Sequence, residues 1–264
     1  MKHQLPEFLP GPTETEDQFK KRVLYCQKLL ENPPEELKPC TQLQPKDLKK
    51  IQNLYSISPS WLPLFISKSG LAPWHGGSLW IFQETLSSPW GAALQLRTTK
   101  PWFYSREEII THELAHAGRM MYHEPKYEEF LAYQTSSSKF RKLFGPIVTS
   151  SGEALMVMAL ILFTVFIEVL SLDSYWGMLT LVKLIPIAFI VAGFLRLGLR
   201  HKNYHRCLKN LETFIPKDQA LAFIYRLTDD EIDHMGTLSQ SSLKDYMKSQ
   251  SSFRWKLIKE HFQC

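Results

Sequence analysis

Residues 154–195 read ALMVMALILFTVFIEVLSLDSYWGMLTLVKLIPIAFIVAGFL, and this apolar stretch separates two polar parts of the chain. It contains a run of 19 residues at 154–172 and a run of 20 residues at 176–195, each with a single charged side chain. At about 1.5 Å per helical residue, each run is long enough to cross a hydrocarbon core of roughly 30 Å. The polar link at 173–175 is too short to cross back, so the sequence predicts an antiparallel helical hairpin in a membrane.

Basic side chains flank this hairpin, and the link between its runs contains none. Because loops on the cytoplasmic side of a membrane carry an excess of lysine and arginine, we expect both polar parts to be cytoplasmic. Residues 1–12 lack the apolar run of a secretory signal, which agrees with this orientation. The sequence therefore predicts an integral membrane protein with two transmembrane helices and cytoplasmic N- and C-termini. The flanking basic residues are Lys139, Arg141 and Lys142 before the hairpin and Arg196, Arg200, Lys202, Arg206 and Lys209 after its last apolar residue.

Two charged side chains, Glu168 and Lys183, lie inside the apolar runs at a similar distance from the link. They can form an ion pair that holds the hairpin together, or each can extend toward the nearby interface, and the sequence leaves both readings open. A pair of buried core helices is the alternative to a membrane hairpin. It is disfavoured because almost forty nearly unbroken apolar residues exceed what a small domain buries.

The composition is that of a folded protein, with 44% hydrophobic and 22% charged residues among 264. The formal net charge is +5, but the basic residues are spread along the chain, so we expect membrane lipid and not nucleic acid as a partner. Four cysteines stand far apart without a CxxC pair, which argues against a zinc ribbon or a dense disulfide framework and favours reduced thiols. The oligomeric state stays open.

The chain divides into four regions. The proline-rich first region should hold short helices, of which Asp17–Leu30 is the best defined. The polar tail after the hairpin has helical periodicity, notably at 216–227, and a capping box at Thr228–Glu231; the sequence does not decide whether it packs on the rest or binds a partner. The regions are a Pro-rich helical part at 1–63, an α+β domain at 64–150, the hairpin at 151–200 and a cytoplasmic helical tail at 201–264.

Two short runs at 78–83 and 92–98 predict the strands of a small sheet in the second region. They are rich in aromatic and aliphatic residues and are separated by a turn. The second of them can offer an edge to an extended peptide, because main-chain pairing aligns a peptide without demanding particular side chains. The turn-like stretch before the first strand contains His75, to which we assign no metal role.

A helix with a clear start follows the strands. Ser105 can cap its first turn, and Glu108 three residues later can complete a reciprocal capping box. We expect this helix to end at Pro125, and a second helix to extend from about Tyr127 to Phe140.

The first of these helices contains the sequence His112-Glu113-Leu114-Ala115-His116. Two histidines four residues apart lie about 40° apart on one helical face, so both imidazoles can reach a single ion. Glu113 projects to the neighbouring face, where a carboxylate can take a proton from a metal-activated water and pass it to a leaving amine. The pattern predicts a catalytic zinc site.

Such a site needs a third protein ligand and one open position. A third histidine in an elongated form of the motif would require glycine at 119 and histidine at 122, where this chain has Arg119 and Tyr122. A carboxylate from the second helix, Glu128 or Glu129, is the better candidate. Adjacent helical positions differ by about 100°, so only one of the two can face the ion, and the other can hydrogen-bond a ligand histidine or be solvated.

The combination of HExxH on one helix and Glu on the next resembles the gluzincin metallopeptidases. Glu129-Phe130-Leu131-Ala132 is similar to the Glu-Phe-x-Ala motif of the membrane-embedded HtpX and CAAX-prenyl protease group, which has Asp at the position of Tyr133. The short gap between His116 and Glu129 is closer to the compact ImmA/IrrE type. The resemblance implies zinc as cofactor, Glu129 as its third ligand with Glu128 as the rival, and a small α+β, zincin-like domain.

The sequence thus predicts a membrane-anchored zinc metallopeptidase in which Glu113 is the catalytic acid and base. Its substrates would be peptides or membrane-proximal proteins. The alternative is a non-enzymatic membrane anchor or recruiter with a structural or degenerate metal site, and the hairpin also resembles those of inclusion-membrane proteins of obligate intracellular bacteria. Tyr122, Tyr127 and Tyr133 surround the motif and can donate to an oxyanion, but the sequence does not single one out.

Overall fold

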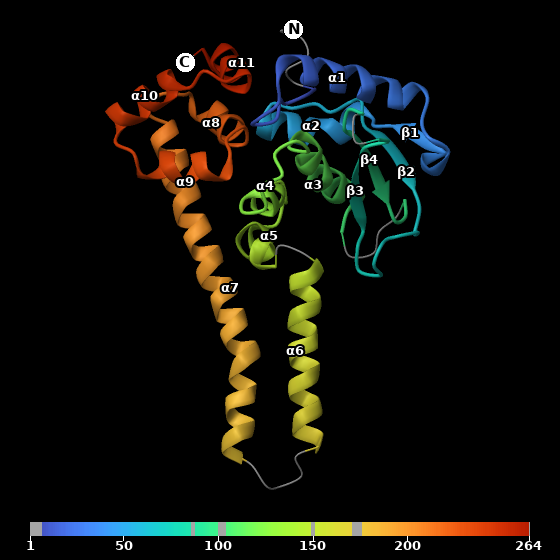
Figure 1. The fold of residues 1–264 in the computed structure, drawn as a ribbon, viewed down its shortest axis with the longest axis vertical. Helices are drawn as coiled ribbons and strands as arrows, with labels where there is room; N and C mark the ends of the chain where they lie inside the picture. Colours follow the sequence, from blue (N-terminus) through green and yellow to red (C-terminus); the bar gives the residue numbers. More distant parts are fainter. Residues whose placement is uncertain (1–6, 86–87, 100–103, 149–150, 171–175, 264) are drawn as a thin grey trace.

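The computed structural model describes residues 7–85, 88–99, 104–148, 151–170 and 176–263. The polar parts of the chain form one head, and two long helices project from it as a stem (Figure 1). Both ends of the chain lie at the side of the head away from the stem. The predicted link at 173–175, the first six residues and Cys264 lie outside the described residues.

The N-terminal region forms α1 (Glu16–Glu31), a 3-10 turn η1 (Glu35–Leu37) and α2 (Pro45–Tyr55). The helix predicted at Asp17–Leu30 is confirmed as α1, which a reciprocal capping box between Thr15 and Gln18 begins. Its buried side chains, among them Phe19 and Val23, recur at helical spacing and face the core.

A mixed sheet of four strands lies beside these helices, in the order β1-β2-β4-β3. Its strands are β1 (Cys40–Gln42), β2 (Pro63–Ile66), β3 (Gly77–Phe82) and β4 (Gly91–Leu96). The two predicted strands are confirmed as β3 and β4. The other two strands were missed, because runs of three and four residues are too short to show an alternating pattern.

The prediction that residues 92–98 offer a free edge is wrong. β4 lies between β2, to which it is parallel, and β3, to which it is antiparallel, and all six of its residues are buried. β3 is the edge strand next to β4.

The motif helix is α3 (Arg106–Gly118), which ends seven residues before the predicted end at Pro125. It ends early because the next side chains turn toward the C-terminal tail. The guanidinium of Arg119 donates from Nη1 to the carbonyl oxygens of Tyr225 and Leu227, at 2.6 and 2.8 Å.

The second predicted helix is divided in two, α4 (Glu128–Gln134) and α5 (Lys139–Phe144), followed by a 3-10 turn η2 (Gly145–Ile147). The break comes at Thr135, whose hydroxyl donates to the Ala132 carbonyl at 2.6 Å, and Ser138 caps the new start. Hydrogen bonds from side chains to the backbone thus interrupt the continuous helix expected at Tyr127–Phe140.

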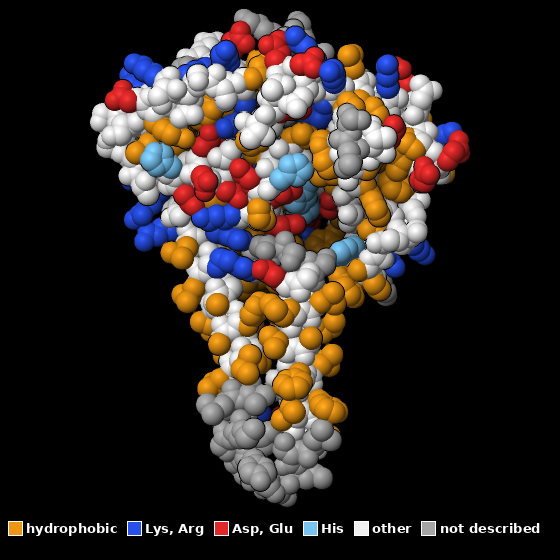
Figure 2. Space-filling model, viewed as in Figure 1, with side chains coloured by type: hydrophobic (Ala, Val, Ile, Leu, Met, Phe, Trp, Pro, Cys, Tyr) orange, Lys and Arg blue, Asp and Glu red, His pale blue; other side chains and the backbone are white. Residues whose placement is uncertain are grey.

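The stem consists of α6 (Ser151–Leu170) and α7 (Trp176–Leu211), and both are long and apolar enough to cross a membrane. In the described part of the stem many apolar side chains are exposed, as Figure 2 shows. Of the two readings of Glu168 and Lys183, the structure has the ion pair, with Nζ 2.6 Å from Oε1. α7 continues well beyond the predicted span, as far as Leu211 in the head, where it packs on α9 (Asp229–Thr237).

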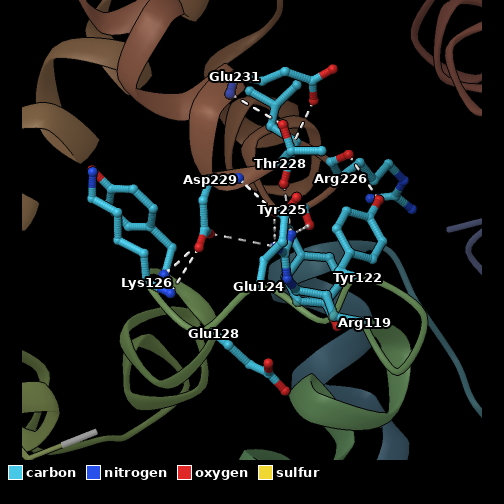
Figure 3. Close-up of polar contacts among 12 residues, drawn as sticks. Arg119, Tyr122, Glu124, Lys126, Glu128, Tyr225, Arg226, Thr228, Asp229 and Glu231 are labelled. Atoms are coloured by element: carbon cyan, nitrogen blue, oxygen red, sulfur yellow. Dashed lines mark hydrogen bonds and ion pairs between the residues drawn. The ribbon is translucent and has the colours of Figure 1, made fainter. Parts of the chain in front are cut away.

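The tail forms α8 (Lys217–Ile224), α9 (Asp229–Thr237), α10 (Gln240–Ser249) and α11 (Phe253–Phe262). The capping box at Thr228 and Glu231 is confirmed. The question that the sequence left open is answered, because the tail packs on the head: Lys126 N donates to Asp229, and Tyr122 donates to the Arg226 carbonyl (Figure 3). One cluster of buried apolar side chains includes residues from all parts of the head, such as Phe8, Leu94, Phe130, Tyr204 and Phe262.

Candidate metal centre

Hydrogen bonds at the start of α3 fix the position of the helix that carries the motif. Ser105 caps the helix by accepting from the Glu108 amide, as predicted. The predicted return bond of the capping box, from the Ser105 amide to the Glu108 carboxylate, is replaced by other contacts. The Glu108 carboxylate accepts from the Ser136 hydroxyl and, at 2.6 Å, from Arg141. These contacts attach the first turn of α3 to the segment that follows α4.

The buried face of α3 places the motif residues on the opposite side. Ile110 and Leu114 are fully buried in the core. His112, Glu113 and His116 are partly buried and face α4 and β3. The local pattern of apolar residues therefore orients the whole motif.

Three predicted ligands, His112, His116 and Glu129, converge on one point. The Nε2 atoms of the two imidazoles lie 3.3 Å apart. One carboxylate oxygen of Glu129 lies 3.6 Å from Nε2 of His116, and the other lies 3.6 Å from Nε2 of His112. A group of this kind can hold a metal ion.

The spacing of these donor atoms fits a small divalent cation. With bonds of about 2.0–2.1 Å, neighbouring ligand atoms of a tetrahedral zinc site lie about 3.3 Å apart. The three observed distances are close to this value, so an ion can occupy the centre with little movement of the side chains. Two imidazoles and a carboxylate also form a donor set that suits zinc and leaves a fourth position open.

Glu128 has a different role from Glu129. Its Oε1 lies 3.0 Å from Nδ1 of His116, the ring nitrogen that points away from the ligand group. This hydrogen bond leaves Nε2 of His116 free to bind an ion. The backbone of Ala132 hydrogen-bonds the His112 ring, so both imidazoles are oriented by groups on or next to α4.

Burial and neighbouring charges shift the pKa values of the two histidines in opposite directions. Burial, with a contribution from His116, lowers the pKa of His112 to about 3, so this ring is neutral at pH 7. Burial opposes protonation of His116 too, but the hydrogen bond to Glu128 and the carboxylates of Glu129 and Glu113 outweigh it and raise its pKa to about 9. The acidic surroundings therefore favour a positive charge at the centre.

Glu113 lies beside the ligand group and is anchored by the sheet. Its Oε2 accepts from the backbone N–H of Leu79 in β3 at 2.9 Å. Burial is the main cause that raises the pKa of the Glu113 carboxyl, and the charge of Glu129 adds to it. A carboxyl group with a raised pKa can both accept and return a proton near neutral pH.

Within the described parts of the chain no strand pairs with the outer edge of β3, and this edge faces the Glu113 carboxylate. Across the sheet, the Arg97 amide donates to the Gly76 carbonyl, whereas the Leu79 N–H points away from β4 toward Glu113. Because backbone groups alternate in an antiparallel pair, those of Gly77, Leu79 and Ile81 face away from β4. The edge needed for an extended peptide therefore exists on β3 and not on the predicted strand.

The site opens into a cleft of about 700 Å³. Figure 2 shows the head hollowed above the stem, with histidine and acidic side chains in the hollow. His112, Glu113, His116 and Glu129 line the cleft, together with Leu79 and Ile81 of β3 and with Ala154, in the first turn of α6. The candidate metal site is thus accessible from outside and lies close to the start of the stem.

The structure distinguishes the three tyrosines near the motif. Tyr122 donates to the Arg226 carbonyl at 2.8 Å, and Tyr127 donates to Asp233 at 2.7 Å, so both have structural roles. Tyr133 lines the cleft, and its ring packs edge-on against His112 at 4.9 Å. Its position one helical turn after Glu129 was the signal that could have identified it.

His75 also lines the cleft but lies outside the group of residues able to hold a metal ion. It adjoins Gly76 and Gly77, where β3 passes very close to α3. A Cβ atom on Gly76 would lie 2.5 Å from Cδ1 of Ile109, so the two glycines allow this approach. The stretch before β3 thus contributes to the wall of the cleft.

Comparison of the chain with protein-family models, with curated protein sequences and with solved structures finds no match.

Proposed function

We propose that this protein is a membrane-anchored zinc metallopeptidase with a gluzincin-like, zincin-type head. The observation that supports this most directly is the convergence of His112, His116 and Glu129 beside Glu113 in an open cleft. A purely structural metal site is normally closed by four protein ligands, whereas this group has three among the residues that the structure describes, and it adjoins solvent-accessible space.

In this proposal the imidazoles and the Glu129 carboxylate hold the zinc. When bound, zinc would act as a Lewis acid that polarises a peptide carbonyl and lowers the pKa of water. Glu128 keeps the ring of His116 oriented through the bond to Nδ1.

Glu113 is the catalytic acid and base. Its carboxylate takes a proton from the attacking water as the water oxygen forms a bond to the peptide carbonyl carbon. It then gives that proton to the departing amine as the C–N bond breaks, which yields one new carboxylate and one new amine. The Leu79 amide, 2.9 Å from Oε2, holds the Glu113 side chain in the cleft.

Two further features position a peptide. The outward backbone groups of β3 other than the Leu79 amide, which donates to Glu113, can pair with an extended substrate. Tyr133 of α4 lines the same cleft, and we propose that its hydroxyl donates to the developing oxyanion.

The proposed location follows from the stem. α6 and α7 have the length and hydropathy of membrane spans, and basic residues gather where they join the head. We place the head and both termini in the cytoplasm, with the cleft near the membrane surface and with peptides or membrane-proximal proteins as substrates.

The test combines metal analysis with a peptidase assay on the purified full chain in vesicles. We expect about one zinc per chain, lost in His116→Ala, and cleavage of a randomised peptide mixture detected by mass spectrometry. Glu113→Gln should keep the zinc and lower cleavage by roughly 10²–10⁴-fold. Glu107→Gln, an exposed change on the same helix, is the matched control and should change neither.

Persistent cleavage by Glu113→Gln would overturn the catalytic assignment. A protein that binds no metal and cleaves no peptide would support the alternative of a membrane anchor or recruiter with a degenerate site.

A further inference from the structure

We infer that the substrate is a peptide whose membrane anchor lies on the C-terminal side of the scissile bond, so that cleavage releases its N-terminal part. The inference rests on the proposed function and adds to it the direction in which the substrate lies in the cleft.

The first step is that the space for a peptide, the groove, lies along β3 and that a further cavity lies beyond the end of this strand. A cavity of about 160 Å³ adjoins Gly76 and Gly77 at the start of the strand. The large cleft contains Leu79 and Ile81, and a third cavity of about 540 Å³ contains Gln83, just after its end. The first two spaces share lining residues, among them Gly77, and lie along the edge to which Gly77, Leu79 and Ile81 turn their backbone groups, whereas the third lies beyond the far end of the strand.

The second step is the orientation of this groove relative to the stem. The cavity at the start of β3 is lined by Arg141 of α5, which lies where the head meets the stem (Figure 1). The large cleft is lined by Val148 and by Ala154 of α6. The cavity beyond the end of β3 is lined by Glu14, before α1, on the side of the head away from the stem. The groove therefore runs from the membrane side of the head outward.

The third step is the chemistry of the two ends. Toward the stem the groove offers exposed apolar side chains, among them Trp74 at 59% and Val148 at 38% exposure. Beyond β3 it is lined mostly by polar and charged side chains, such as Glu14, Gln18 and Lys21. A peptide that is apolar where it leaves a bilayer and polar farther away matches this gradient.

The fourth step is the direction of the peptide chain. The last residue of β3, Phe82, pairs with Gly91, which adjoins α1 on the side of the head away from the stem (Figure 1), so β3 runs outward from the stem side, antiparallel to β4. A peptide added to this edge pairs most favourably in the antiparallel sense, because parallel pairing is slightly less stable per residue. Its C-terminal end then points toward the membrane.

The distance from the catalytic group to the membrane end is short. Leu79 contacts Glu113, and Gly77 is two residues, or about 7 Å, closer to the stem. A scissile bond beside Glu113 should therefore lie only roughly three to six residues from the anchored end of the substrate.

The experiment uses two peptides with one identical randomised ten-residue segment, carrying a palmitoyl anchor at either the C-terminus or the N-terminus. The full chain is reconstituted in vesicles, and released fragments are quantified by mass spectrometry. Because both peptides have the same surface concentration, the comparison isolates orientation. We expect the C-anchored peptide to be cut at least about tenfold faster, since only that orientation brings the bond to Glu113.

Each outcome decides the inference. Equal rates, or faster cleavage of the N-anchored peptide, would overturn it and leave the proposed peptidase intact. If neither anchored peptide is cut while an unanchored version is cut, the claim that the substrate carries a membrane anchor is wrong, and the proposed peptidase activity stands. No cleavage of any peptide, with zinc bound, would instead refute the proposed function and the inference together.

A matched pair of variants tests the apolar membrane end. Val148→Asp places a charge where the anchored segment would enter, so it should slow cleavage of the C-anchored peptide severalfold more than it slows cleavage of the unanchored peptide, and equal slowing of both would contradict the apolar membrane end. Leu24→Asp, at an exposed position of α1, makes the same kind of change away from the groove and should alter neither rate.

Discussion

At the scale of single residues, the neighbouring carboxylates Glu128 and Glu129 differ in what they contact. Glu129 faces both Nε2 atoms, whereas Glu128 faces Nδ1 of His116. We predict that Glu128→Gln weakens zinc binding by roughly 10–100-fold, because the ring loses its charged orienting partner. Glu129→Gln removes a ligand and should weaken binding more. Competition with a chelator measures both, and the reverse order would show that Glu128 is the third ligand.

Tyr133 differs from the other two tyrosines because its side chain lines the cleft, and the proposed function gives its hydroxyl a chemical role. Tyr133→Phe should lower kcat by roughly 10²-fold through loss of an oxyanion donor, with zinc content and KM nearly unchanged. Tyr122→Phe is the contrasting variant: it removes one of two donors to the buried carbonyl of Arg226, which also accepts from Arg254, and should lower the free energy of unfolding by about 1 kcal/mol. Wild-type kcat in Tyr133→Phe would contradict the assignment.

At the scale of secondary-structure elements, α9 depends on its first turn. The Thr228 hydroxyl accepts from the Glu231 amide, and the Glu231 carboxylate accepts in return from the Thr228 amide. Thr228→Ala should lower the free energy of unfolding by about 1 kcal/mol in urea titrations. Thr237→Ala, an exposed change at the other end of the helix, should have little effect, and equal losses would show that the cap is not the cause.

The two stem helices are connected by the ion pair between Glu168 and Lys183. Glu168→Lys sets two ammonium groups against each other, so we predict a smaller fraction of correctly inserted hairpin, measured by protease protection in vesicles. The exchange Glu168→Lys with Lys183→Glu restores opposite charges and should recover insertion. Failure of the exchange to recover it would mean that each charge acts alone at the interface.

At the scale of the whole molecule, the tail completes the fold of the head. The Arg119 guanidinium donates hydrogen bonds to the carbonyls of Tyr225 and Leu227. The Tyr225 hydroxyl in turn donates to the Ala115 carbonyl within the motif helix. A chain that stops after Leu211 should therefore lose zinc binding and become sensitive to proteolysis throughout the head. A chain shortened by only residues 263–264 is the control, and a stable, zinc-binding product of the first truncation would contradict this dependence.

Much of the site could be predicted because it depends on local spacing. The two histidines and Glu113 are close in sequence, so helical periodicity alone places them together. The break at Thr135 and the early end of α3 at Gly118 could not be predicted in this way. Both depend on side chains that bond backbone groups outside the regular helical pattern.

The amino-acid sequence alone determined two apolar helices of membrane length and a helix that carries HExxH, since length, hydropathy and helical phase are properties of a continuous segment. The tertiary structure alone decided that Glu129 and not Glu128 joins the histidines, that β3 and not β4 has the free edge, and that the tail belongs to the head. These features arise from contacts between segments far apart in the chain, and no local pattern records which distant partner a side chain or a strand will meet.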